Sequence, residues 1–211
     1  MKNLSSKFFL FISLGFLSAN PIHAQETDDE YSYCFLCHGA SGQGNIAIQA
    51  PAIAGISESY LHRQLDSYRN AYRGSDYSAD PAGAEMLSVA QQLTSAQNEG
   101  IINFLAPYKN QSATHSGLDG DADEGKAHYE QQCSACHGND GQGSDILMTD
   151  ALTNLNDWYL VSSFNKYRDG TRGGNPDDTP AHQMHLFVQA LPEDFPINDI
   201  AAYLRSKTIS Q

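Results

Sequence analysis

A five-residue motif, C-x-x-C-H, occurs twice and constrains this chain more than any other feature. The copies are Cys34–His38 and Cys133–His137, and together they contain every cysteine of the sequence. Two thiols one helical turn apart can each add across a haem vinyl group, and the next histidine then lies under the iron. The motif therefore predicts two covalently attached haem c groups with His38 and His137 as proximal ligands. The predicted attachment residues are Cys34, Cys37, Cys133 and Cys136.

Paired cysteines have three other common uses. A redox C-x-x-C pair does not need a histidine directly after it, and the two pairs of a zinc site usually lie roughly 15–20 residues apart. A structural disulfide would also suit an oxidising compartment. The duplicated motif, with Gly39 and Gly138 in equivalent positions, favours haem attachment over all three uses.

The N-terminal residues have the pattern of a secretory signal peptide. Lys2 and Lys7 precede the apolar run Phe8–Leu17, and small or polar residues follow to Ala24. A retained membrane anchor is the alternative, but it needs roughly 20 apolar residues to span a bilayer. The sequence thus predicts cleavage of residues 1–24, export to the periplasm and no transmembrane anchor in the mature protein.

The chain is strongly acidic, with a formal net charge of −13. Residues 1–24 hold two lysines and no acidic residue, so their removal changes this charge from −13 to −15. Nucleic acid and anionic membranes are poor partners for such a protein. A redox protein with a basic docking patch is a better candidate, although the acidity can also serve solubility alone.

An internal repeat with an offset of 99 positions sets the architecture. The matching segments are Gly42–Gly44 and Gly141–Gly143, Tyr60-Leu61 and Tyr159-Leu160, Tyr68-Arg69 and Tyr167-Arg168, and Arg73-Gly74 and Arg172-Gly173. This agreement predicts two tandem domains, over residues 25–108 and 121–211, joined by a polar linker over residues 109–120.

Each domain is predicted to be all-α, with three to four helices around one covalent haem. No stretch alternates convincingly with the period of a strand, whereas apolar residues recur at helical spacing. Thr94 and Gln97 form a capping-box pattern before a helix that ends near Leu105. The other predicted helices span residues 25–37, 58–72, 122–133, 157–168 and 196–207.

Two methionines are candidates for the distal axial ligands. Met86 lies 48 residues after His38, and Met184 lies 47 residues after His137. Both follow Gly-, Pro- and Asp-rich segments, residues 74–85 and 173–183, which predict loops that carry a side chain to the opposite haem face. The alternatives are methionines that only fill core gaps, and ligation of the second haem by His182 or His185.

These features together resemble the dihaem cytochrome c family, subclass four, in which two class I cytochrome c domains occur in tandem. The resemblance covers nearly the whole mature chain. It includes the two C-x-x-C-H motifs, the Gly-Gln-Gly segments, Ala50–Gly55, the paired tyrosines and arginines, both methionines, and the closing helices around Ile101–Leu105 and Ile200–Leu204.

The resemblance also implies roles for three further residues. Pro51 would pack on the His38 side of its haem and orient that imidazole. Arg73 and Arg172 would pair with haem propionates, although ordinary solvated surface arginines remain the alternative. The second half departs from the pattern because it has no equivalent of Pro51, so the His137 ring is expected to be held differently and the two potentials to differ.

The family resemblance implies a periplasmic one-electron carrier rather than an enzyme. Such carriers pass electrons from membrane complexes, such as quinol–cytochrome c oxidoreductase, to terminal oxidases or reductases. The second hypothesis is an electron-accepting dihaem subunit of a dehydrogenase, such as flavocytochrome c sulfide dehydrogenase. The third is a dihaem enzyme, such as a thiosulfate dehydrogenase or a peroxidase, which needs an open or unusually ligated haem.

Overall fold

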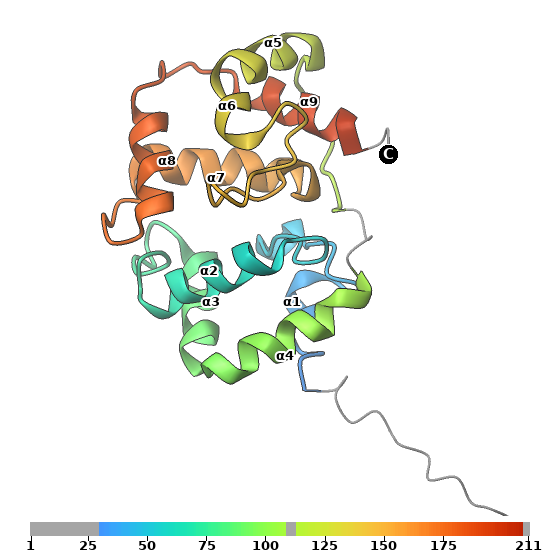
Figure 1. The fold of residues 1–211 in the computed structure, drawn as a ribbon, viewed down its shortest axis with the longest axis vertical. Coiled ribbons are helices and arrows are strands. Elements are labelled where there is room, and N and C mark those ends of the chain that lie inside the picture. The colour runs from blue at the N-terminus through green and yellow to red at the C-terminus, as the bar shows by residue number, and fades with distance from the viewer. Residues whose placement is uncertain (1–29, 109–112, 209–211) are drawn as a thin grey trace, which may run out of the picture.

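The computed structural model describes residues 30–108 and 113–208, which form two helical lobes joined by one connection (Figure 1). Within these ranges the chain forms helices, turns and isolated bridges but no strand. The prediction of an all-α chain with two tandem domains is therefore confirmed. None of the described helices is both long and apolar enough to span a bilayer. The predicted signal peptide lies outside the described residues.

The first lobe begins at its C-x-x-C-H motif. Its helices are α1 Cys34–His38, α2 Glu58–Arg69, α3 Pro81–Gln92 and α4 Ser95–Leu105, with 3₁₀ turns at Ile46–Ile48 and Ala106–Tyr108. The Ser57 hydroxyl accepts a hydrogen bond from the amide of Tyr60 and caps α2. Thr94 and Gln97 form the predicted capping box of α4.

The second lobe repeats this plan and adds one helix before its motif. Its helices are α5 Ala122–Gln132, α6 Ser134–His137, α7 Asp157–Asp169, α8 Thr179–Gln189 and α9 Ile197–Thr208, with a 3₁₀ turn at Leu152–Asn154. Helices α5 and α9 cross closely because α5 has Gly125 at the crossing. A Cβ atom on Gly125 would lie 1.9 Å from the carbonyl oxygen of Asp199.

Two predictions about local structure were wrong. Segments 74–85 and 173–183 were expected to be loops that end at the methionines, but Met86 lies inside α3 and Met184 inside α8. Both helices have a proline in the first turn, where the missing amide hydrogen costs nothing. The opening helix predicted over 25–37 begins only at Cys34, and residues 25–29 lie outside the described residues.

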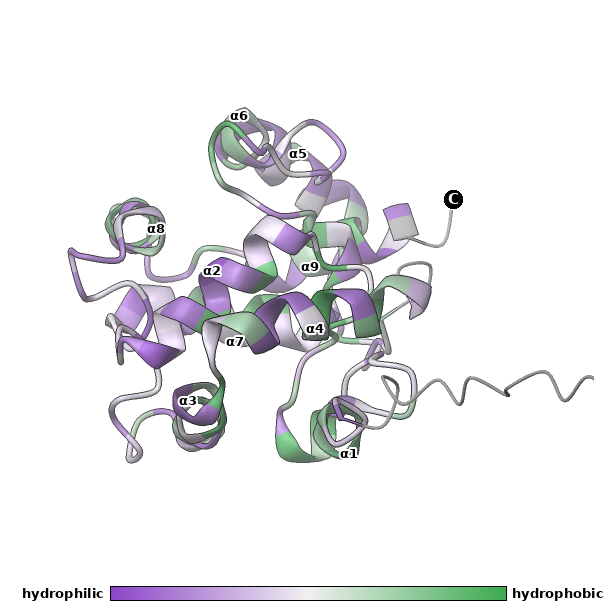
Figure 2. Ribbon diagram, turned by 60° about the horizontal axis from the view of Figure 1, so that its bottom comes forward, coloured by the Kyte–Doolittle hydropathy of each residue, from purple (hydrophilic) through white to green (hydrophobic). Residues whose placement is uncertain are grey.

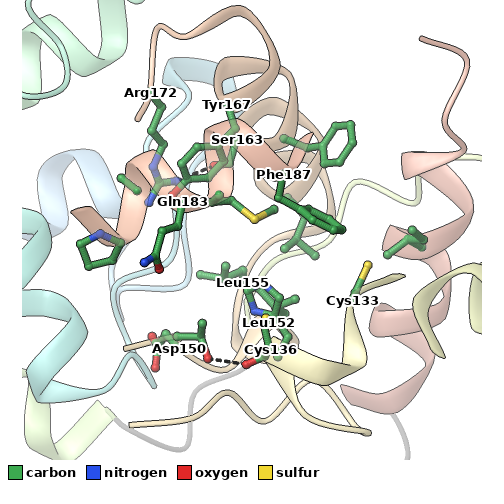
Figure 3. A pocket seen from close by; sticks show the side chains of 18 of the residues that line it. Cys133, Cys136, Asp150, Leu152, Leu155, Ser163, Tyr167, Arg172, Gln183 and Phe187 are labelled. Atoms are coloured by element: carbon green, nitrogen blue, oxygen red, sulfur yellow. Dashed lines mark hydrogen bonds between the residues drawn. The ribbon is translucent and has the colours of Figure 1, made fainter. Parts of the chain in front are cut away.

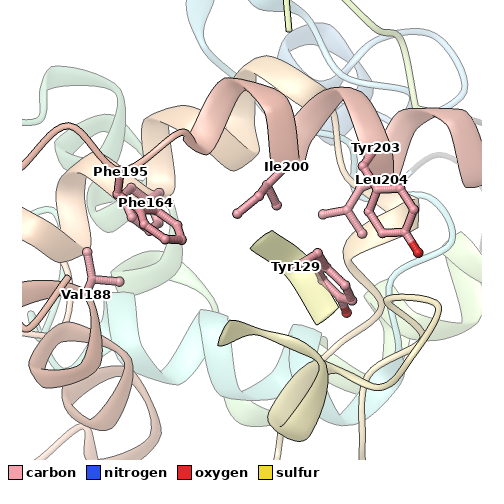
Figure 4. Packing of buried hydrophobic residues seen from close by; sticks show 7 residues of the cluster. All are labelled: Tyr129, Phe164, Val188, Phe195, Ile200, Tyr203 and Leu204. Atoms are coloured by element: carbon pink, nitrogen blue, oxygen red, sulfur yellow. The ribbon is translucent and has the colours of Figure 1, made fainter. Parts of the chain in front are cut away.

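Each lobe has an apolar cluster that its candidate haem residues contact. The clusters consist of Tyr129, Phe164, Val188, Phe195, Ile200, Tyr203 and Leu204 in the second lobe (Figure 4), and Tyr31, Leu65, Ala90, Leu93, Ile101 and Leu105 in the first. Cys133 and Met184 pack against the second-lobe cluster, and Cys34 and Met86 pack against the first-lobe cluster. The fold therefore brings one motif cysteine and one candidate methionine to the same apolar core in each lobe.

Helices α2 and α7 lie in the middle of the molecule, where the lobes meet (Figures 1 and 2). Figure 2 shows α2 as a predominantly hydrophilic helix despite this central position. Several contacts between the described parts of the two lobes are hydrogen bonds from polar side chains, and one is the ion pair between Lys166 and Asp80.

Candidate haem sites and the interface between them

A cavity of about 280 Å³ opens in the second lobe (Figure 3). Cys133, Cys136, His137 and Met184 all line it. Its remaining walls are largely apolar and include Leu152, Leu155, Leu160, Phe164 and Phe187. The structure therefore gathers both predicted attachment thiols and both predicted axial ligands of the second repeat around one apolar space.

The proximal imidazoles lie in unequal surroundings. His38 Nδ1 lies 2.6 Å from the carbonyl oxygen of Pro51, a contact through which Pro51 would orient the ring. His137 Nδ1 is buried and has no hydrogen-bond partner among the residues that the structure describes. Burial lowers the pKa of His137 to about 4 and also lowers the pKa of His38, so both rings are neutral near pH 7, as metal ligation requires.

On the other side of the second-lobe cavity, the methionine is better placed than the two nearby histidines. Met184 lines the cavity, whereas His182 and His185 are absent from its walls. The His182 ring lies 2.8 Å from the carbonyl oxygen of Gly173, and the His185 ring lies 2.5 Å from that of Tyr167. Both rings are thus engaged by backbone carbonyls outside the cavity, which favours Met184 as the ligand.

The four cysteines are free and lie in two separate lobes. Cys34 and Cys133 are half-buried, and burial raises the pKa of each thiol to about 11. Their partners Cys37 and Cys136 are exposed. Among the described residues, the cysteines are part of no metal-binding cluster. Two isolated, non-disulfide pairs beside apolar clusters fit thioether attachment and do not fit a zinc site.

Arg73 and Arg172 are buried at the interface, each with only 3% of its surface exposed, so the alternative of solvated surface arginines is wrong. Arg172 donates hydrogen bonds to the Tyr60 hydroxyl at 2.8 Å and to Gln64 Oε1 at 2.9 Å, both across the interface. Arg73 also donates to Gln64 and approaches the Tyr159 hydroxyl at 3.4 Å.

No carboxylate pairs with either guanidinium within the described residues, and the Nε atoms of Arg73 and Arg172 are buried without a partner. Burial would raise the pKa of the Tyr159 phenol, but the two guanidinium charges outweigh it and lower the value to about 7. Two uncompensated buried cations are costly unless an anion joins them. This environment fits haem propionates.

Sequence reasoning missed a second set of polar residues that join the lobes. Lys166 donates to Asp80 at 2.7 Å, and Ser67 donates to Asp178 at 2.6 Å. Asp80 and Asp178 stand just before α3 and α8, so each methionine-bearing helix begins at a carboxylate bound by the opposite lobe. The recurrence of Asp80 and Asp178 at an offset of 98 was a visible signal of equivalent roles.

The linker is also tied to the second lobe through Asp157, which is fully buried. Its carboxylate accepts hydrogen bonds from the amides of Ser116 and Gly117 at 2.8 and 3.1 Å. Arg205 of α9 donates to the same carboxylate at 2.7 Å. The described part of the segment predicted as a plain linker is therefore a structured connection.

Both halves of the chain are similar to known cytochromes c. The cytochrome c family model matches residues 31–108 and again residues 122–208. Cytochrome c-552 of Acidithiobacillus ferridurans is 29% identical over 188 residues, covering 83% of this chain and 74% of that protein. The thiosulfate dehydrogenase electron acceptor of Stutzerimonas stutzeri (strain A1501) is 30% identical over 170 residues, or 77% of each chain. The solved cytochrome c4 structure of Acidithiobacillus ferrooxidans covers 83% of this chain and 99% of its own, at 28% identity and a TM-score of 0.65.

Proposed function

We propose that this chain, which belongs to the cytochrome c family and carries two covalently bound haem c groups, is a periplasmic electron relay. It would receive single electrons from a membrane quinol–cytochrome c oxidoreductase and deliver them to a terminal oxidase or reductase. The observation that carries this proposal is the second-lobe cavity, where a proximal histidine and a distal methionine line the same apolar space.

Each repeat offers a complete set of haem-holding residues. Cys34 and Cys37 would attach the first haem, with His38 and Met86 as its axial ligands. In the second repeat the attaching residues are Cys133 and Cys136, and the ligands are His137 and Met184. When bound, each haem supplies a reversible one-electron couple between ferric and ferrous iron, and a methionine thioether favours the ferrous state.

Other residues of the chain shape the haem sites and set the charge around them. The largely apolar walls of the second-lobe cavity suit a porphyrin, and the exposed Cys37 and Cys136 leave an edge of each site at the surface for partner proteins. Arg73 and Arg172 would neutralise propionates at the interface and so bring the two sites together. The net charge of −13 suits a partner with a basic docking patch.

A redox titration of the holoprotein with optical detection tests the proposal. We expect two one-electron couples, two haems by mass spectrometry, and a methionine-to-iron charge-transfer band from each. Carbon monoxide binding readily to both ferrous centres of the undenatured protein would overturn it, because a relay keeps its coordination positions filled.

The 30% identity with a thiosulfate dehydrogenase electron acceptor favours a second candidate, in which the electrons come from a soluble dehydrogenase. The flavocytochrome c sulfide dehydrogenase hypothesis belongs to the same class. Stopped-flow reduction distinguishes a dehydrogenase partner from the quinol complex. Rapid reduction by a thiosulfate dehydrogenase with its substrate, and slow reduction by the quinol complex, would favour the dehydrogenase partner. Purification of the chain with a bound flavoprotein would instead identify a subunit.

A further inference from the structure

Asn156 of the second lobe reaches across the interface to the proximal side of the first haem site. The residue is fully buried. Its Oδ1 atom accepts a hydrogen bond from the backbone amide of Ala52 at 2.7 Å. Its Nδ2 atom donates to the backbone carbonyls of Gln43 at 3.0 Å and Thr114 at 2.7 Å. One side chain thereby joins the first lobe, the connecting segment and the start of α7.

The Ala52 amide and the Pro51 carbonyl belong to the same peptide group. That peptide is planar, so fixing its N–H also fixes the direction of its C=O. The carbonyl oxygen of Pro51 is the atom that lies 2.6 Å from His38 Nδ1. Hydrogen bonds in such a chain polarise one another, so acceptance by Asn156 makes the Pro51 oxygen a stronger acceptor.

The surrounding residues are shaped to admit Asn156. Gly44 has a φ of +93°, and a Cβ atom there would lie 2.7 Å from Asn156 Nδ2 and 2.9 Å from the Ala52 amide nitrogen. The approach of Asn156 to this peptide therefore requires glycine at position 44. The second glycine of the Gly-Gln-Gly segment thus has a specific structural function in the first lobe.

The second lobe is arranged differently. Ser57 occupies the position equivalent to Asn156; its hydroxyl caps α2 by accepting from the amide of Tyr60, and its backbone amide donates to the side-chain carboxylate of Asp150 at 3.3 Å. Asp150 stands in place of Pro51, and in the described part of the chain His137 Nδ1 has no hydrogen-bond partner. Within the described residues, the first site alone combines a hydrogen-bonded proximal ring with a neighbouring backbone peptide that is bound by the opposite lobe.

We propose that Asn156 is a positioning residue for the proximal ligand of the first haem, acting across the domain interface through the Pro51–Ala52 peptide. A hydrogen bond from imidazole Nδ1 to a strong acceptor makes the other nitrogen more basic, which stabilises ferric iron. The first haem then has the lower reduction potential of the two, and that potential depends on the docked second lobe. This inference rests on the proposed ligation of iron by His38.

The test compares wild-type holoprotein with the Asn156→Ala variant in a redox titration that follows haem methyl signals of each site by NMR. We expect the potential of the first haem to rise toward that of the second, which itself stays unchanged. The His38 Nδ1 proton should exchange faster with solvent in the variant. The matched control is Asn154→Ala, because Asn154 also donates across the interface, to the Gly55 carbonyl at 2.6 Å, but does not touch the Pro51–Ala52 peptide.

The milder Asn156→Ser variant keeps a polar group at the site and should give a smaller shift of the same sign, even if the alanine variant unfolds. Unchanged potentials in a folded Asn156 variant, or an equal shift in Asn154→Ala, would overturn the inference. A wild-type first haem without histidine–methionine spectra would show that the ligand assignment itself has failed. That result is distinguishable because it appears before any substitution is made.

Discussion

The two lobes share one plan but hold their proximal histidines differently. In the first, His38 bonds to Pro51 and the segment is braced from the other lobe by Asn156. In the second, no residue within 30–108 and 113–208 forms a hydrogen bond with Nδ1 of the buried His137 ring. Duplication thus kept the candidate ligands at corresponding places in the two repeats, while the residues around the proximal histidines diverged.

The same divergence recurs at the interface. Equivalent positions 67 and 166 each reach the carboxylate that precedes the methionine-bearing helix of the opposite lobe, one as Ser67 and the other as Lys166. The contacts between the lobes therefore include two pseudo-symmetric ties of unequal strength, a neutral hydroxyl on Asp178 and an ammonium ion on Asp80. Each tie connects one lobe to the distal side of the other.

The largest effect is expected when the distal methionine of one site is replaced and that of the other site is kept. Met86→Ala and Met184→Ala should each abolish the sulfur-to-iron charge-transfer band of one haem and lower the potential of that haem, because the thioether favours ferrous iron. Absorption spectroscopy in the near infrared measures this. Met148→Ala is the control, since Met148 has no counterpart in the first repeat and is 48% exposed. Persistence of both bands in either ligand variant would show that the assignment is wrong.

The next effect concerns the start of the two central interface helices, where Glu58 is exposed and its counterpart Asp157 is fully buried. Burial raises the pKa of Asp157, but hydrogen bonds from the Ser116 amide and Arg205 outweigh it and hold that pKa well below the ordinary 3.8. Asp157→Asn should reduce the free energy of unfolding at pH 7 by about 3 kcal/mol, as expected for breaking a buried ion pair. Glu58→Gln should change it little.

The difference in the free energy of unfolding between wild type and Asp157→Asn should depend on pH in a defined direction. A carboxyl group with a folded pKa below its unfolded value stabilises the protein fully above the unfolded value, here 3.8, and loses that contribution as the pH falls through the folded pKa. Denaturation of wild type and Asp157→Asn between pH 7 and 2 should show a constant gap down to about pH 4 and a shrinking gap below it. A gap that widens under acid would contradict the carboxylate's role.

Much of this architecture was readable from local patterns, and the rest was not. The C-x-x-C-H motifs and the capping box at Thr94 depend on residues close in sequence, and the repeat is found by comparing the chain with itself, so the haems and the helical class could be predicted. The start of α3 was missed because Asp80 and Pro81 were interpreted as loop residues rather than as a cap and a first turn. The partners of Asn156 lie 42 to 113 positions away in the chain, beyond the reach of a local pattern.

Breaking the stronger interlobe tie, between Lys166 and Asp80, is the third test of the comparison between the lobes. Asp80 is only 2% exposed, and Lys166→Met would leave its carboxylate without a cation. The free energy of unfolding should fall by about 2 kcal/mol, less than the cost for a fully buried pair because the lysine is partly exposed. Denaturant titration followed by haem absorbance measures the change. An unchanged midpoint would show that solvent already compensates Asp80.

The weaker tie should have the smallest effect. Ser67→Ala removes the hydroxyl that donates to Asp178 at 2.6 Å, and the expected cost is about 1 kcal/mol for one neutral donor on a largely buried carboxylate. Measured beside Lys166→Met in the same denaturant titration, it should shift the midpoint by the smaller amount. Because Asp178 stands directly before α8, the variant should also loosen the Met184 side of the second site and leave the Met86 side unchanged. Equal costs for the two substitutions would mean that charge adds nothing to the tie, and the contrast between the lobes would then reside in their proximal sides alone.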